Sequence, residues 1–102
     1  MDESANHSSF VPSGKWAEVP SYSQLSPKAM ACLTGAVNGQ NNEQIASTLG
    51  CRPKSVGVYL TRAFKRIATL DEIGESMPGR SNRQQVAELL IQHGYFEPEA
   101  QS

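Results

Sequence analysis

The chain has 102 residues and a net charge of −1, which fits one domain with short tails. Its start is acidic and rich in serine without an apolar run, so we expect no secretory signal. No stretch approaches the roughly 18 apolar residues of a membrane-spanning helix, and we therefore expect a soluble, intracellular protein.

The small net charge conceals an uneven distribution along the chain. Residues 1–24 sum to −2, residues 25–70 to +5 and residues 71–102 to −4. The charged residues of the central segment are Lys28, Arg52, Lys54, Arg62, Lys65 and Arg66, against the single acid Glu43. A basic central third of this kind is typical of a surface that binds a polyanion.

The cysteines and histidines do not form a recognisable site. Cys32 and Cys51 lack a CxxC spacing and a nearby histidine, which favours buried, reduced, structural thiols. His7 lies in the N-terminal tail and His93 near the end of a predicted helix, so we expect no histidine-based active site. No carboxylate pair, nucleophile–base set or phosphate loop can be placed either. We therefore expect no enzyme, no metal site and no cofactor.

Residues 1–24 read as a flexible arm. They contain six serines, two prolines and a glycine, and they show no helical period. Phe10, Trp16 and Tyr22 occur at intervals of six residues, which is unusual for a simple spacer. Two interpretations stay open: one or two of these aromatic residues pack on the flank of the domain, or the arm binds a partner.

Two short helices are predicted after the arm. Ser26 supplies a hydroxyl N-cap and Pro27 the first helical residue, and Gly39 ends this first helix. Asn41 caps a second helix, in which Gln44 completes a capping-box pattern. Both beginnings follow from local chemistry, because each cap satisfies backbone N–H groups that have no partner inside the helix.

A third helix follows after a very tight link. Gly50 ends the second helix and Pro53 opens the third, which we expect to extend over residues 53–68. Two helices joined by so short a glycine-containing turn are typical of a helix-turn-helix motif.

The third helix has two contrasting faces at 100° per residue. Its predicted core stripe consists of Val56, Leu60, Ala63 and Ile67. The opposite face carries Lys54, Val58, Thr61, Arg62 and Lys65. Because this helix contains no acid, the pattern favours a surface that faces an anion over an ordinary solvated face.

A fourth helix is expected after an irregular connection over residues 69–80. Ser81 caps it, Gln84 completes a second capping box, and Gly94 ends it. One apolar stripe consists of Val86, Leu89, Leu90 and His93, and a second, offset stripe consists of Ala87 and Ile91. We expect the first stripe to pack on the core and the second to form a subunit contact.

These helices, without a convincing alternating strand, predict an all-α fold. The segment from Leu25 to Leu90 resembles the LuxR-type (GerE-like) helix-turn-helix domain of bacterial transcription regulators, and it covers about two-thirds of the chain. The matching positions are Leu25-Ser26-Pro27, Leu33, Gly39, Asn42, Ile45-Ala46, Leu49-Gly50, Lys54-Ser55-Val56, Phe64, Ile67, Asn82-Arg83 and Val86. We therefore expect a flexible arm at 1–24, a four-helix domain at 25–96 and a tail at 97–102.

The resemblance implies that the third helix enters the major groove while the second braces it across the DNA backbone. The predicted DNA-binding residues are Asn41, Arg52, Lys54, Ser55, Val58, Thr61, Arg62 and Lys65. Val58 can touch a thymine methyl and Arg62 can fork onto guanine. The fourth helix commonly mediates dimerisation in the family, which assigns Ala87 and Ile91 to the interface of a weak homodimer.

The chain also departs from the family pattern. Gly57 stands where the family usually has a lysine, Tyr59 replaces a frequent histidine, and Arg52 replaces a Ser or Thr cap. The leading hypothesis is a stand-alone regulator that binds duplex DNA in the bacterial cytoplasm, at the nucleoid. The alternative is a helix-turn-helix-derived interaction protein that binds another regulator or RNA polymerase, in which case the N-terminal arm is a candidate contact.

Overall fold

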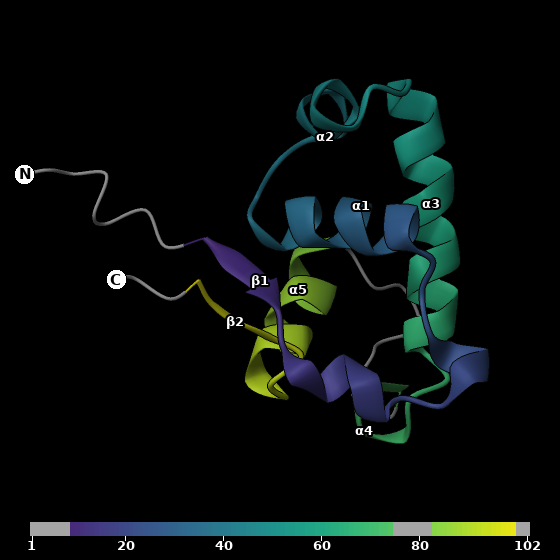
Figure 1. Cartoon of the computed structure of the whole chain (residues 1–102), viewed down its shortest axis with the longest axis vertical. Helices are drawn as coiled ribbons and strands as arrows, with labels where there is room; N and C mark the ends of the chain where they lie inside the picture. The colour runs from purple at the N-terminus through teal and green to yellow at the C-terminus, as the bar shows by residue number, and fades with distance from the viewer. Residues whose placement is uncertain (1–8, 75–82, 100–102) are drawn as a thin grey trace, which may run out of the picture.

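Three helices pack against one another, and two short strands from distant parts of the chain lie side by side next to them (Figure 1). The computed structural model describes residues 9–74 and 83–99, and no helix there has the length and apolarity to cross a membrane. In chain order the elements are β1 (Phe10–Pro12), the 3-10 helices η2 (Gly14–Glu18) and η3 (Ser21–Ser23), α1 (Pro27–Val37), α2 (Asn42–Leu49), α3 (Pro53–Ile67), α4 (Asp71–Gly74), α5 (Arg83–Gln92) and β2 (Phe96–Pro98). The predicted mostly helical fold is confirmed.

The predicted starts of the first two helices are confirmed by their caps. Ser26 Oγ accepts a hydrogen bond from the Ala29 amide at 3.2 Å at the start of α1. At α2, Asn41 Oδ1 accepts from the Gln44 amide at 2.8 Å, and Gln44 Oε1 accepts from the Asn41 amide at 2.9 Å. Gly50 then ends α2 in the left-handed region, with φ at +72°, which glycine adopts without steric cost.

The core stripe predicted for the third helix is buried. The buried residues of α3 are Val56, Leu60, Ala63 and Ile67. Val56 and Leu60 pack with α1 and α2 around the fully buried Cys32, whereas Ile67 packs with α5 and both ends of the chain. Cys32 and Cys51 are free thiols, and Cys51 is half-buried. This packing fixes α3 so that its opposite face is directed outward.

The N-terminal segment differs from the expected flexible arm. Trp16 is 8 % exposed, its indole N–H donates to the Tyr95 carbonyl at 2.8 Å, and its ring lies against Tyr95 and Phe96. The expectation is therefore wrong for residues 10–24, because buried aromatic area outweighs the loop-like Ser/Pro composition. Of the two interpretations, packing on the domain holds for Trp16. Residues 1–8 lie outside the described part.

β1 and β2 form a small antiparallel sheet that the sequence did not predict. Phe10 pairs with Pro98, Val11 with Glu97 and Pro12 with Phe96. Asn38, just after α1, covers the other edge of β1: its Oδ1 accepts from the Phe10 amide at 2.7 Å and its Nδ2 donates to the Phe10 carbonyl at 3.0 Å. The expected tail at 97–102 is thus partly wrong, because residues 97 and 98 belong to β2.

The fourth predicted helix corresponds to α5, with one correction. Ala87 was expected on an uncovered stripe with Ile91, but it is 9 % exposed and belongs to the core that Val37 of α1 shares. The end of α1 lies along this side of α5, which leaves Ile91 half-buried. The connection expected to be irregular over 69–80 contains the short helix α4, and the expected cap Ser81 lies outside the described residues.

Candidate nucleic-acid interface

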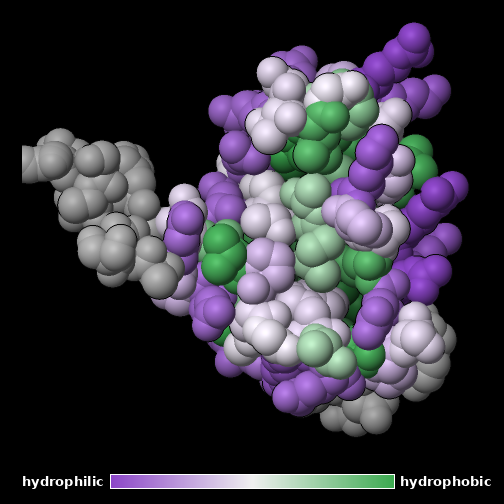
Figure 2. All heavy atoms as spheres, in the orientation of Figure 1, coloured by the Kyte–Doolittle hydropathy of each residue, from purple (hydrophilic) through white to green (hydrophobic). Residues whose placement is uncertain are grey.

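The outward face of α3 carries the residues that the sequence predicted for it. A shallow depression along this face is lined by Lys54, Gly57, Val58, Thr61, Arg62 and Lys65. Val58 is 45 % exposed, more than any other large hydrophobic side chain in residues 9–74 and 83–99. Figure 2 shows hydrophilic side chains projecting along the edge of the molecule that α3 forms in Figure 1. The face therefore combines cations with one apolar contact point.

The charges of this face are unpaired. Lys54, Arg62 and Lys65 are exposed and form no hydrogen bond or ion pair with any residue that the structure describes. The Thr61 hydroxyl donates to the Gly57 carbonyl at 2.9 Å, so its oxygen keeps its acceptor capacity. Because α3 contains no acid, no carboxylate of the same helix neutralises these cations. Such a surface attracts a polyanion.

The other predicted site residues lie around the starts of α2 and α3. Arg52 is exposed at the N-cap of α3 and contributes no side-chain cap hydrogen bond, while Ser55 is half-buried in the first turn. Asn41 is exposed, but its Oδ1 is engaged in the cap of α2. The structure therefore brings seven of the eight residues together on α3 and its cap, and leaves Asn41 on the neighbouring helix.

A second depression, which shares Arg62 with the first, was not predicted. It is lined by Gln24, Leu25, Ser26, Ala29, Tyr59, Arg62, Ala63 and Arg66. Arg66 Nη1 donates to the Gln24 carbonyl at 3.3 Å, which ties the basic end of α3 to the chain before α1. Helical periodicity placed Arg66 off the outward face, and its contact with residue 24 depends on how α1 packs.

Arg83 links the fourth predicted helix to the start of α2, which the sequence also did not predict. Its Nη1 donates to the Gln40 carbonyl at 3.1 Å, and its Nη2 donates to Asn42 Oδ1. The resemblance had matched Asn42 and Arg83 only as separate positions. Their hydrogen bond holds the side chain of Asn42 beside Gly57 of α3. If residue 57 had a β-carbon, that atom would lie 3.6 Å from Asn42 Nδ2.

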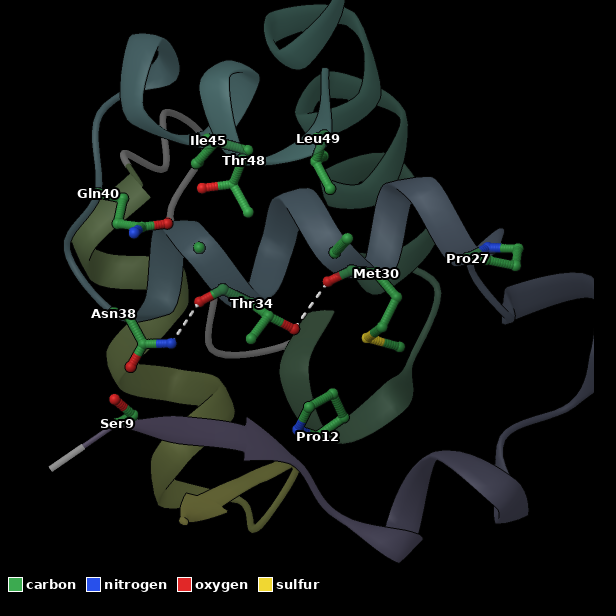
Figure 3. A pocket seen from close by; sticks show the side chains of 12 residues that line it. Ser9, Pro12, Pro27, Met30, Thr34, Asn38, Gln40, Ile45, Thr48 and Leu49 are labelled. Atoms are coloured by element: carbon green, nitrogen blue, oxygen red, sulfur yellow. Dashed lines mark hydrogen bonds between the residues drawn. The ribbon is translucent and has the colours of Figure 1, made fainter. Parts of the chain in front are cut away.

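An apolar groove lies on another side, between α1, α2 and β1 (Figure 3). Ile45, Thr48 and Leu49 of α2 lie along one side of α1, while the side chains of Met30 and Thr34 point away from α2 toward Pro12 of β1. None of its lining residues is titratable, so it offers no acid, base or metal ligand. Within the described ranges there is also no group of three or more His, Cys, Asp and Glu residues that could hold a metal ion.

One protein family matches the chain. The model of the GerE family, described as bacterial regulatory proteins of the luxR family, matches residues 23–72. The match begins just before α1 and ends within α4, so it contains α1, α2 and α3. No curated protein and no solved structure matches the chain. The segment 10–22 and helix α5 lie outside the matched range.

Proposed function

We propose that this chain, which carries a DNA-binding helix-turn-helix domain of the LuxR family of bacterial regulatory proteins, regulates transcription by inserting α3 into the major groove of duplex DNA. The observation that carries the proposal is the acid-free outward face of α3, on which Lys54, Arg62 and Lys65 are unpaired. Acting on the chromosome, the protein would work in the cytoplasm, at the nucleoid.

The residues of this face fall into two groups by their chemistry. Lys54 and Lys65 are exposed point charges suited to phosphates, which position the protein without reading sequence. Val58, Thr61 and Arg62 are suited to base edges: an apolar contact with a thymine methyl, a hydroxyl acceptor and a bidentate fork for guanine. Arg52, Ser55 and Asn41 would add backbone contacts at the helix starts.

We propose further that the 102-residue chain binds its sites by itself. Trp16 contacts Tyr95 and Phe96, and β1 pairs with β2. These contacts join the two sides of the segment from residue 10 to residue 98, which supports an independent folding unit. The burial of Trp16 argues against the partner-binding arm of the alternative hypothesis. A chain that fails to bind DNA would restore that alternative, with another regulator or RNA polymerase as the partner.

DNA binding is tested by salt dependence on a genomic fragment found by immunoprecipitation of the tagged protein. Lys65→Ala should weaken binding to all sequences and reduce the slope of log affinity against log salt by about 0.9. Arg62→Ala should instead change the preference among sites. The matched control is Lys15→Gln, which removes one positive charge from η2, where Lys15 Nζ donates to the His93 carbonyl. Absence of binding to any genomic fragment at about 50 mM salt refutes the proposal.

We also propose that two copies bind a two-fold site through α5. Since Ala87 is buried, the contact would use the shallow groove between α1 and α5, where Gln84 and Glu88 are exposed and Ile91 is half-buried. Such a small patch predicts a weak dimer that a palindromic site stabilises. Sedimentation should show that Ile91→Glu reduces the dimer fraction. A wild-type protein that stays monomeric at hundreds of micromolar, with and without DNA, would exclude the dimer.

A further inference from the structure

Gly57 is a glycine that the fold does not need. It lies within α3, and its φ is not positive, since the described glycines with positive φ are Gly39, Gly50 and Gly94. A β-carbon on Gly57 would meet only Asn42 Nδ2, at 3.6 Å, which is ordinary van der Waals contact. At Gly35, by contrast, a β-carbon would lie 2.6 Å from Ile45 Cγ1, so packing requires that glycine.

Gly57 therefore lowers the stability of α3, and no packing contact requires a glycine there. Glycine inside a helix is less favourable than alanine by about 1 kcal/mol, which corresponds to about fivefold in the folding equilibrium. The missing β-carbon leaves open space, a gap, on the side of α3 that faces Asn42. Gly57 also lines the depression on the outward face, together with Lys54 and Thr61.

Asn42 has a defined orientation at this gap. Its Oδ1 accepts from the guanidinium of Arg83, which also donates to the Gln40 carbonyl. An amide whose oxygen is held by a cation must direct its NH2 group the other way, and Nδ2 is the atom nearest to Gly57. Nδ2 makes no hydrogen bond within the described residues. The NH2 group of this half-buried amide is therefore a donor that an acceptor from outside the chain can use.

We propose that Asn42 Nδ2 donates a hydrogen bond to a phosphate oxygen of duplex DNA through the gap at Gly57, with Arg83 as the residue that positions the amide. The inference rests on the proposed function, because it supposes that the face of α3 lies against DNA. A phosphate fits the site because its oxygens accept hydrogen bonds. When the outward face of α3 lies against base edges, the phosphates of the DNA backbone lie beside the flank of the helix.

Three variants test this contact on the DNA fragment that the wild type binds. Gly57→Ala should raise the folding equilibrium constant about fivefold and yet weaken DNA binding about tenfold, because the new methyl group fills the gap. Asn42→Ala should weaken binding about tenfold without changing the salt slope, since the amide is neutral. Ser47→Ala, at an exposed position of the same helix, is the matched control and should bind as the wild type does.

The double variants decide whether the residues act together. Gly57→Ala with Asn42→Ala should bind no more weakly than either single variant, because both remove the same hydrogen bond. Arg83→Met should weaken binding in the wild type but not in the Asn42→Ala background, at a temperature where all variants are folded; a merely structural Arg83 would weaken both equally. Wild-type affinity of Gly57→Ala and Asn42→Ala, or additive losses, would overturn the inference. If Lys65→Ala still loses affinity and salt slope, the proposed function survives that failure; if the wild type binds no DNA, both fail.

Discussion

Replacing Trp16 by alanine should destabilise the whole domain, because this residue joins the N-terminal segment to α5 and β2. Its ring centroid lies 4.9 Å from that of Tyr95 and 6.1 Å from that of Phe96, and only 8 % of the residue is exposed. Truncation of a buried Trp or Phe to alanine costs about 3–5 kcal/mol. For a domain of this size that is a large share of a total stability of about 5–15 kcal/mol.

The hydrogen bond of Trp16 can be separated from its apolar contribution. Trp16→Phe keeps an aromatic ring but loses the N–H that donates to the Tyr95 carbonyl at 2.8 Å. That carbonyl still accepts from the Ser13 amide at 3.0 Å, so it is not left unsatisfied. The phenylalanine variant should therefore lose only about 1 kcal/mol for the hydrogen bond, plus a packing loss smaller than that of alanine.

Urea and thermal denaturation, both followed by far-ultraviolet circular dichroism, measure the two variants, since Trp16 is the sole tryptophan and its fluorescence disappears on substitution. At about 4–8 °C per kcal/mol, Trp16→Ala should lower Tm by about 12 °C or more. DNA affinity at a temperature where the variant remains folded should be unchanged, because Trp16 lies outside the face of α3. A loss below about 1 kcal/mol for Trp16→Ala, or wild-type fluorescence typical of full water exposure, would refute the packing argument.

Two further substitutions test the core between α1 and α2. Gly35→Ala should destabilise the fold by about 1–3 kcal/mol, because the added methyl group would lie 2.6 Å from Ile45 Cγ1 and 2.8 Å from Gln40 Oε1; a urea midpoint equal to that of the wild type would contradict this packing. Burial, with a smaller contribution from Cys51, raises the pKa of the Cys32 thiol above its ordinary 9.0. The folded state therefore favours the neutral thiol. The contribution of the buried neutral Cys32 to the free energy of unfolding is present below pH 9 and is lost as the pH rises through the raised pKa. The urea midpoint should fall more between pH 7 and pH 10 in the wild type than in Cys32→Ala, and equal falls would contradict it.

The sequence alone determined the local features of the domain. The starts of α1 and α2, the turn at Gly50 and the two faces of α3 depend on residues within one or two helical turns of each other. Caps and helical periodicity act at that range, so they can be read without a structure. The charge pattern also identified the outward face of α3, because no acid of the same helix is available to neutralise it.

Only the tertiary structure decided how the ends of the chain and α5 complete the domain. Trp16 bonds to a residue 79 positions later, and Arg83 reaches back 41 positions to Asn42. The composition of residues 10–24 resembles that of a flexible arm, and the apolar stripe of Ala87 and Ile91 resembles a subunit contact. Neither pattern shows which distant segment of the chain packs against these residues. Their burial depends on contacts between segments far apart in the sequence, and such contacts produce no periodic pattern in it. The orientation of the Asn42 amide beside Gly57 arises in the same way, from hydrogen bonds that Arg83, at the start of α5, makes to Gln40 and Asn42.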